Sequence, residues 1–184
     1  MSERIEITLN VNGTDHAIRV EPRRTLADAL RADCGLTGTN VGCEHGVCGA
    51  CTVLLDGEPV RSCLMFAVQA QGRRLRTVEG LAAGGTLHPL QQSFIEHHAL
   101  QCGFCTSGFL MLAAGTLERE PVIDDLRLRE VLASNLCRCT GYQNIERAVR
   151  AVRDRALAGA CDSVQAAGSG EGAGVPASAP GRTR

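Results

Sequence analysis

The sequence has 184 residues, a formal net charge of −1 from 19 basic and 20 acidic side chains, and 3 % aromatic residues. With no excess of positive charge and few rings for base stacking, it excludes nucleic acid as the main partner. It contains no lysine, which excludes an active-site lysine. No apolar run approaches the roughly 20 residues of a membrane span, and no secretory signal is present. We therefore expect a cytoplasmic protein whose ten cysteines serve metal or redox chemistry rather than disulfides.

The first half has the patterns of a small sheet with one helix. Apolar and polar residues alternate along the first segment, and the dipeptides Asn12-Gly13 and Asp56-Gly57 favour tight hairpin turns. Thr25 is a candidate N-cap. These patterns predict, in chain order, strands at 5–11 and 17–20, a short helix from 25 to about 31, and strands at 52–55, 59–62 and 74–78.

The second half has helical spacing and no further hairpin signals. Apolar residues recur at intervals of three and four over 88–99, 104–117, 124–133 and 143–158. In the last segment Ile145 and Val149 belong to an apolar face, and the arginines Arg147, Arg150 and Arg153 are assigned to the opposite one. Residues 159–184 are rich in glycine and alanine and are predicted to be disordered. The expected class is α+β, with domains at 1–80 and 81–158, a linker at 80–86 and a tail at 159–184.

Four cysteines in the first half have the spacing of an iron–sulfur site. They are Cys43, Cys48, Cys51 and Cys63. The opening C-x4-C-x2-C is the spacing of plant-type [2Fe–2S] ferredoxins. Gly42, Gly46 and Gly49 would let the backbone turn tightly around the cluster and expose amides to its sulfurs. Zinc sites use paired C-x2-C knuckles, which this set lacks.

Four cysteines in the second half form another set, which is ambiguous by itself. They are Cys102, Cys105, Cys137 and Cys139. The C-x2-C pair alone is compatible with a redox dithiol or with half of a zinc site. Helix N-termini directed at these cysteines would offset the negative charge of a cluster. Cys34 is interpreted as a small buried apolar side chain, and no role is assigned to Cys161.

Taken together, these motifs resemble the iron–sulfur subunits of the molybdenum hydroxylases, the xanthine dehydrogenase family. The resemblance covers about residues 4 to 156 and rests on three segments in the same order: 42–53, 101–106 (Gln-Cys-Gly-Phe-Cys-Thr) and 135–142 (Asn-Leu-Cys-Arg-Cys-Thr-Gly-Tyr). It implies a β-grasp ferredoxin domain followed by a four-helix bundle, each with one [2Fe–2S] cluster. Ser107 and Ser134 stand where many relatives have Pro and Gly, and Ser134 would be strained if it were left-handed.

The resemblance also implies partners and a direction of electron flow. The second cluster would lie beside molybdopterin in a large subunit, with Gln101 contacting the pterin and Cys139 as the nearest ligand. Electrons would pass to the first cluster and then to an FAD-binding medium subunit or an external acceptor. This chain has no nucleotide-binding motif, so flavin and molybdopterin would belong to partners.

Two other functions are compatible with part of the sequence. A free-standing ferredoxin shuttle explains the first cysteine set but leaves the second unused, and it would purify alone. A zinc-stabilised interaction module would be colourless, whereas iron–sulfur centres absorb visible light.

Overall fold

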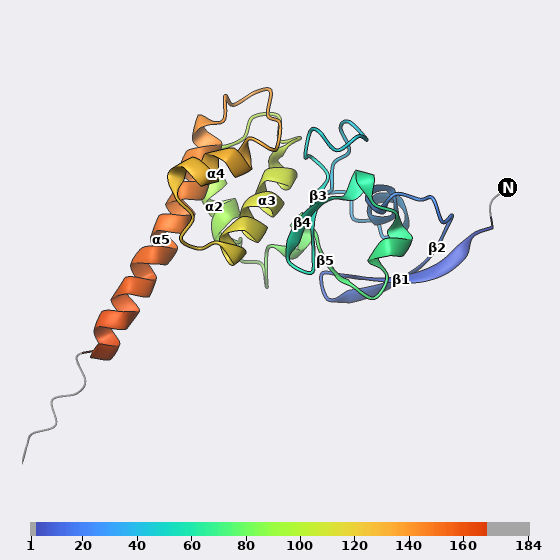
Figure 1. Ribbon diagram of the computed structural model, residues 1–184, viewed down its shortest axis with the longest axis horizontal. Helices are drawn as coiled ribbons and strands as arrows, with labels where there is room; N and C mark the ends of the chain where they lie inside the picture. Colours follow the sequence, from blue (N-terminus) through green and yellow to red (C-terminus); the bar gives the residue numbers. More distant parts are fainter. Residues whose placement is uncertain (1–2, 169–184) are drawn as a thin grey trace, which may run out of the picture.

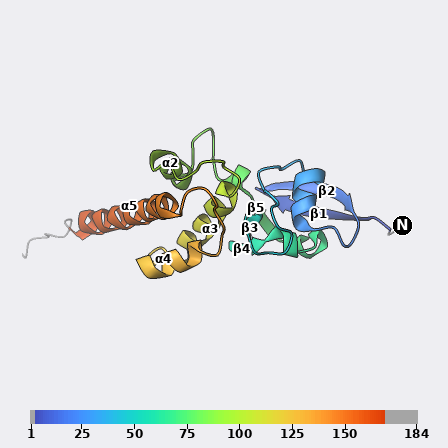
Figure 2. The same ribbon diagram turned by 90° about the horizontal axis from the view of Figure 1, so that it is seen from above.

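The computed structural model describes residues 3–168, with side chains up to residue 159. Within this range a five-stranded mixed sheet precedes a group of helices (Figures 1 and 2). The sheet order is β2-β1-β5-β3-β4, in which the last strand of the sequence takes the central place. β5 runs parallel to β1 and antiparallel to β3. The bounds are β1 Ile5–Val11, β2 Thr14–Val20, β3 Thr52–Leu55, β4 Glu58–Arg61 and β5 Arg74–Arg76. This is the predicted β-grasp arrangement.

Both hairpins turn where the sequence predicts. Asn12 and Gly13 have φ values of 53° and 79°, and Asp56 and Gly57 have 52° and 89°. Positive φ at both central positions is the requirement of a tight two-residue hairpin. The second strand is longer than predicted, because it starts directly after the turn at Thr14.

The predicted short helix covers the sheet but changes its winding. α1 spans Leu26–Asp28, and the Thr25 side chain accepts a hydrogen bond from the Asp28 amide, as an N-cap does. A π-helical turn, Ala29–Asp33, continues it. Cys34 follows, half-buried against the sheet core, and burial raises the pKa of its thiol to about 11. This supports its interpretation as a small apolar side chain.

The four predicted helices are present. They are α2 Pro89–Glu96, α3 Thr106–Arg119, α4 Asp125–Leu132 and α5 Gln143–Gly168. The prediction that disorder begins at 159 is wrong for the first ten residues, because α5 continues to Gly168 and projects beyond the bundle (Figure 1). Alanines, the best helix formers, explain the continuation. Residues 169–184 lie outside the described range, so their predicted disorder stays a prediction. No described helix is long and apolar enough to cross a membrane.

Helix α3 joins the two halves of the molecule. One side of α3 packs in the helical core through Phe109 and Met111, and that core also includes Leu54 of strand β3. Gly115 allows this close packing, since a Cβ there would lie 2.6 Å from Leu54 Cδ2. A tight turn about Gly84-Gly85, bridged by Ala83 and Thr86, lies in the predicted linker. The division into domains at residue 80 remains a prediction.

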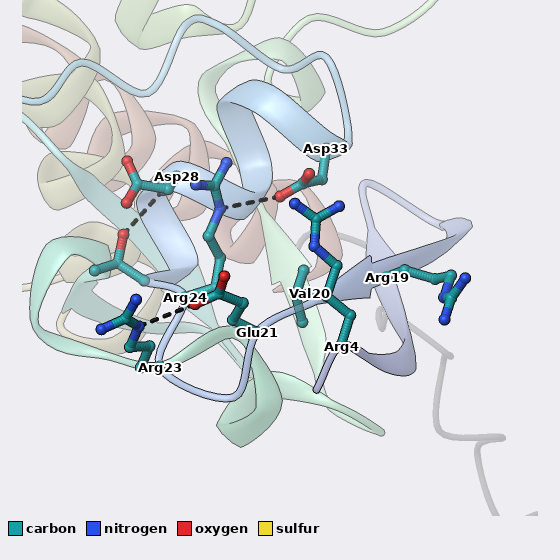
Figure 3. A pocket seen from close by; sticks show the side chains of 9 residues that line it. Arg4, Arg19, Val20, Glu21, Arg23, Arg24, Asp28 and Asp33 are labelled. Atoms are coloured by element: carbon teal, nitrogen blue, oxygen red, sulfur yellow. Dashed lines mark hydrogen bonds and ion pairs between the residues drawn. The ribbon is translucent and has the colours of Figure 1, made fainter. Parts of the chain in front are cut away.

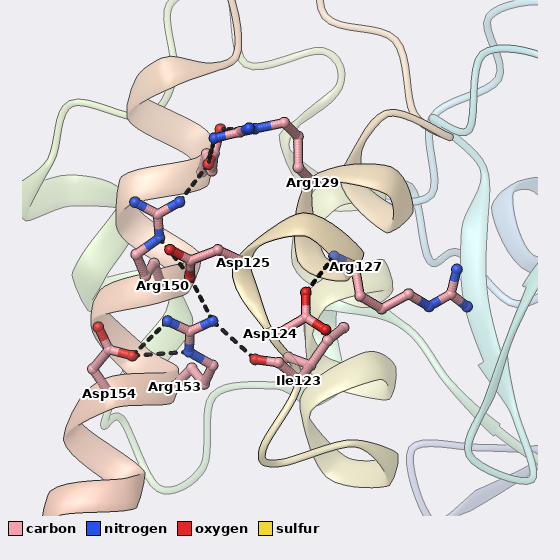
Figure 4. A network of polar contacts seen from close by, with 9 residues as sticks. Ile123, Asp124, Asp125, Arg127, Arg129, Arg150, Arg153 and Asp154 are labelled. Atoms are coloured by element: carbon pink, nitrogen blue, oxygen red, sulfur yellow. Dashed lines mark hydrogen bonds and ion pairs between the residues drawn. The ribbon is translucent and has the colours of Figure 1, made fainter.

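The predicted polar face of the last helix is partly wrong, because Arg153 is buried. Only 9 % of this residue is exposed. Its guanidinium donates to the Ile123 carbonyl at 2.9 Å and pairs with Asp125 and Asp154 at 2.8 Å each (Figure 4). Simple helical periodicity misplaces it, since a long polar side chain can be buried when every donor finds an acceptor.

Replacing Arg153 by methionine should lower the free energy of unfolding by about 1–3 kcal/mol, because the buried Ile123 carbonyl loses its partner. Urea unfolding followed by circular dichroism measures this. The matched control is Arg155→Met, which breaks an exposed pair with Glu96 and should cost at most about 1 kcal/mol. Equal effects of the two substitutions would contradict the role assigned to Arg153.

Glu146 links α4 to α5 and should make stability depend on pH. Hydrogen bonds from Arg129, with a further ion pair to Arg150, hold the pKa of the Glu146 carboxyl below its ordinary value of 4.5. A lowered carboxyl pKa adds stability above the ordinary pKa, and this contribution disappears as the pH falls through the folded value. Glu146→Gln should therefore destabilise the protein at pH 7 and much less below pH 4. Urea unfolding at both pH values, with the exposed Glu6→Gln as control, measures the difference.

Candidate metal centres

The first cysteine set lies in the long segment before β3 and in the turn after β4. Cys43, Cys48 and Cys51 come from the loop, and Cys63 comes from a 3-10 turn, Ser62–Leu64, that directly follows β4. Cys51 and Cys63 are buried beside Ala27 of α1, and the other two are half-buried. The fold thus places a fourth sulfur, from outside the loop, against the three that the spacing predicts.

The thiols of this set interact in two pairs, Cys43 with Cys48 and Cys51 with Cys63. The Cys48 amide donates to Cys43 Sγ at 3.4 Å. Hydrogen bonds from the backbone N–H groups of Cys48 and His45 lower the pKa of the Cys43 thiol to about 6. Burial, and then the neighbouring Cys51 thiol, raise the pKa of Cys63 to about 11. Amides directed at a thiolate also stabilise the negative sulfurs of a cluster, so the loop is suited to hold one.

Only two of the three predicted loop glycines have the expected conformation. Gly46 and Gly49 have φ values of 83° and 72°, and the non-glycine Glu44 also has a positive φ, 57°. Gly42 does not. Its missing Cβ instead leaves room for the Phe104 ring, which would lie 3.1 Å from that atom. The tight turn of the loop is confirmed at Gly46 and Gly49. Gly42 instead allows the second half of the chain, through Phe104, to pack closely against the loop.

The second cysteine set lies where α3 begins and where the segment between α4 and α5 turns. Cys105 is the N-cap residue of α3. Cys137 is buried, Cys105 half-buried, and Cys102 and Cys139 are exposed. The positive end of the 14-residue α3 dipole therefore faces this set, as the sequence predicts for a site that holds negative charge.

These sulfurs also come in two pairs. Cys102 and Cys139 lie with their sulfurs 3.6 Å apart. Burial raises the pKa of Cys105 to about 12, and the adjacent Cys137 thiol adds to the shift. Burial alone would raise the pKa of Cys137, but hydrogen bonds from Thr140 lower it. The Thr140 hydroxyl lies 3.1 Å from Cys137 Sγ.

The paired arrangement fits [2Fe–2S] clusters. Four cysteines hold the two irons of such a cluster, which is two protein sulfurs for each iron. Within the described side chains, no three His, Cys, Asp or Glu residues gather as they would around a single metal ion. The cysteine pairs of both sets match the donor requirement of a dinuclear centre. A bound metal would deprotonate these thiols, and its positive charge would offset the repulsion between neighbouring thiolates.

Gln101 lies next to the second set. Its side-chain amide donates to the Cys139 carbonyl at 3.0 Å, and the residue is exposed. It caps neither neighbouring helix, because His88 and Cys105 are the N-cap residues of α2 and α3. The structure thus brings together the two residues that the resemblance implies lie closest to the pterin.

Backbone and side-chain hydrogen bonds connect the two cysteine sites directly. The Leu136 amide donates to the Cys48 carbonyl at 2.9 Å, and the Asn40 side chain donates to the Phe104 carbonyl at 2.9 Å. The segments 40–51, 101–105 and 134–142 meet along one edge of the molecule, the upper edge in Figure 1. The two sites are therefore neighbours.

Sequence reasoning missed the residues that support these ligands. Tyr142, which has a positive φ of 67°, accepts a hydrogen bond from the Cys137 amide at 3.0 Å. Asn135 is 1 % exposed and donates to the Gly49 carbonyl. Arg61 donates to the Ser134 carbonyl at 2.8 Å. Asn135 and Tyr142 belong to a segment that carries the family resemblance, and Arg61 lies two residues before Cys63, but neither signal reveals these contacts.

Of the two departures from the family pattern, Ser134 is accommodated without strain and Ser107 leaves a buried hydroxyl unsatisfied in the part of the chain that the structure describes. Ser134 is not among the described residues with positive φ, so the strain considered for it does not arise. The Ser107 hydroxyl is buried and has no hydrogen-bond partner within the described residues. Neither serine belongs to the two sets of candidate metal ligands.

A hollow of about 400 Å³ lies away from the cysteines, between the ends of β1 and β2 and helix α1 (Figure 3). Arg23 pairs with Glu21 at 2.9 Å, and Arg24 pairs with Asp33 at 3.2 Å. No cysteine lines it. The hollow is therefore separate from the two candidate centres.

Comparison with known proteins identifies both halves. Residues 9–82 match the 2Fe-2S iron-sulfur cluster binding domain, and residues 77–150 match the [2Fe-2S] binding domain. The chain therefore carries two [2Fe–2S] clusters.

Similar proteins agree over most of the chain. The 6-hydroxypseudooxynicotine dehydrogenase complex subunit beta of Paenarthrobacter nicotinovorans is 61 % identical over 140 residues, which is 76 % of this chain and 88 % of that protein. The caffeine dehydrogenase subunit gamma of Pseudomonas sp. (strain CBB1) is 57 % identical over 149 residues, covering 79 % and 89 %. The structure of quinoline 2-oxidoreductase from Pseudomonas putida 86 superposes with a TM-score of 0.80 at 52 % identity, over 86 % of this chain and 99 % of that chain. The chain thus belongs to the iron–sulfur subunits of the molybdenum hydroxylases, which transfer electrons.

Proposed function

We propose that Cys43, Cys48, Cys51 and Cys63 hold the first cluster and that Cys102, Cys105, Cys137 and Cys139 hold the second. The observation that carries this proposal is the pairing of thiols within each set, together with the contact between the two sets through Leu136 and Cys48. Electrons would enter at the second cluster and leave from the first, one at a time. The chain itself converts no substrate.

The exposed side of the second site is proposed as the face that meets a large molybdopterin-binding subunit. Cys102 and Cys139 are exposed there. Leu100, Phe104 and Leu136, which flank the cysteines in the sequence, are exposed by 41 %, 49 % and 50 %. Exposed apolar side chains beside a polar site are typical of a protein interface, and a partner that covers them would exclude water from the second cluster. Gln101 would contact the pterin from this face.

The first site is proposed to face the next acceptor, an FAD-binding subunit or an external molecule. Val47 and Leu64, next to its ligands, are exposed by 56 % and 62 %. An apolar rim around the outer cluster would let an acceptor approach closely. We place the whole assembly in the cytoplasm, where reduced thiols are available for cluster insertion.

Purification of the tagged chain from its native source, under anaerobic conditions, tests the proposal. We expect a complex with a chain of much greater mass, four irons per copy of this chain, and two distinct electron paramagnetic resonance (EPR) signals after reduction. A monomer that elutes alone would support a shuttle instead. Fewer irons, or one paramagnetic species, would overturn the two-cluster assignment.

A pair of variants tests the proposed large-subunit face. Leu100→Asp places a charge beside the second site and should reduce recovery of the complex at least tenfold, while leaving both EPR signals in place. Val122→Asp is the control, since Val122 is 75 % exposed and follows the opposite end of α3, about 20 Å along the helix axis. Equal recovery of the two variants would contradict this placement.

The class of substrate is proposed from the named relatives. Caffeine and quinoline, which appear in the names of two of them, are nitrogen heterocycles. We therefore propose that the assembled enzyme oxidises an N-heteroaromatic compound in its large subunit. Bleaching of the visible cluster absorption by quinoline or caffeine, and not by a simple aldehyde, is the expected result; bleaching by the aldehyde alone would contradict it.

A further inference from the structure

We propose that Gly108 sets the distance between the two clusters, by allowing helix α3 to rest directly on the backbone of the first cluster's loop. The inference rests on the proposed assignment of the cluster ligands. Gly108 is buried on α3, three residues after Cys105 of the second site. A Cβ at this position would lie 2.3 Å from the Gly49 carbonyl oxygen and 3.0 Å from Ala50 Cα. Gly49 and Ala50 separate Cys48 from Cys51 of the first site. The contact therefore joins one ligand segment of each cluster.

The Gly49 carbonyl cannot turn aside to relieve such a clash. It accepts hydrogen bonds from the Thr52 amide at 3.1 Å, the Thr52 hydroxyl at 2.6 Å and the Asn135 side chain at 3.3 Å. On its other flank Gly49 meets Asn135, since a Cβ on Gly49 would lie 2.0 Å from Asn135 Oδ1. The peptide is thus held by Thr52 and by Asn135, so we infer that a clash here is relieved by a shift of the helix.

Both ligand segments of the second site touch this one peptide. Gly108 belongs to the helix whose N-cap is Cys105, and Asn135 precedes Cys137 by two residues. A displacement of α3 therefore changes the separation of the two sites, because Cys105 moves with the helix. Non-bonded atoms prefer separations near 3.5 Å, so a methyl group at Gly108 would move α3 away by roughly 1 Å. Electron transfer between the clusters becomes slower as they separate, because electronic coupling decays exponentially with distance.

Gly115 provides a matched comparison on the same helix. It lies seven residues after Gly108, so the two share a face of α3. A Cβ at Gly115 would meet side-chain atoms, Leu54 Cδ2 at 2.6 Å and Pro59 Cγ at 2.8 Å, rather than cluster-loop backbone. Gly115 lies about 10 Å farther from the cysteines along the helix. Both substitutions crowd the contact between α3 and the sheet, but only Gly108→Ala pushes directly on a cluster loop.

The test measures the magnetic interaction between the reduced clusters, which decreases with the cube of their distance. In the full chain within its native complex, Gly108→Ala should retain four irons and both EPR signals. The splitting that each cluster causes in the signal of the other should decrease, and the transfer rate between the clusters should fall several-fold. Gly115→Ala should lower thermal stability without changing the splitting. An unchanged splitting in Gly108→Ala, or an equal decrease in both variants, would overturn the inference.

A second variant tests the same inference if Gly108→Ala loses one of the clusters. Asn135→Ala removes the other support of the Gly49 peptide while deleting atoms rather than adding them. In molecules that keep four irons it should broaden the splitting, because Thr52 alone then holds the Gly49 peptide on which Gly108 rests. A splitting of unchanged size and width would overturn the inference. Failure of the proposed function is distinguishable, since it would appear in the wild-type protein as fewer than four irons or as a single paramagnetic species.

Discussion

Replacing Cys51 by serine in the full chain should remove the first cluster and reduce the iron content from four to two atoms per chain. Cys51 is 2 % exposed and lies in the same buried group as Cys63. A serine hydroxyl is a poor ligand for iron beside a soft thiolate, and the buried position leaves little room for water to take its place. Iron analysis, and the loss of one of two EPR signals after reduction, measure the effect.

The consequence for electron transfer should be large. With the outer cluster absent, electrons that reach the second cluster have no route to the acceptor, so steady-state turnover should fall at least a hundredfold. The second cluster's signal should persist. Cys34→Ser is the control, because Cys34 is half-buried at the end of α1's π-helical continuation and belongs to neither set. Loss of iron in the control, or full iron in Cys51→Ser, would contradict the ligand assignment.

Replacing Phe109 by alanine should be the most destabilising of these substitutions. Phe109 is fully buried in the helical core, and its ring meets Tyr142 edge-on, with centroids 6.2 Å apart. Removing a buried phenyl group leaves a cavity and costs about 3–5 kcal/mol. Because Tyr142 accepts a hydrogen bond from the Cys137 amide, the cavity also frees a residue that supports the second site.

This coupling gives the substitution a specific signature. On heating Phe109→Ala, the second cluster's EPR signal should disappear at a lower temperature than the first. Phe66→Ala removes the same group from a position that is 49 % exposed, and it should change the free energy of unfolding by less than about 1 kcal/mol. Simultaneous loss of both signals in Phe109→Ala would show that the second site does not depend on this packing.

The features that the sequence predicted well are those controlled by local chemistry. Asn-Gly and Asp-Gly dipeptides determine the two hairpins, and the Thr25 cap forms as expected. Helical periodicity located all four long helices to within a few residues at most ends. The three loop cysteines of the first set follow from the C-x4-C-x2-C spacing, because a cluster needs thiolates at short intervals along a turning backbone. The second set is ambiguous by spacing and follows from the family resemblance.

The features that local patterns could not predict depend on contacts between distant segments. Arg153 is buried because it meets acceptors on Ile123, before α4, and on Asp125, the first residue of α4, and no rule of helical spacing contains that information. Asn135 and Gly108 are recognisable only once the first cluster's loop lies against the second half. The short 3-10 turns, such as Val78–Gly80, are too brief to produce a periodic signal.

The unequal burial of the two sites has a consequence for how the subunit is handled and assembled. In the first site Cys51 and Cys63 are buried by the chain's own fold and Cys43 and Cys48 are half-buried, whereas in the second site Cys102 and Cys139 are exposed. Dioxygen attacks an iron–sulfur centre most readily where solvent reaches its sulfurs. A freshly synthesised, unassembled copy should therefore be more vulnerable at the second site than at the first, and a partner on the proposed large-subunit face would protect that site against air.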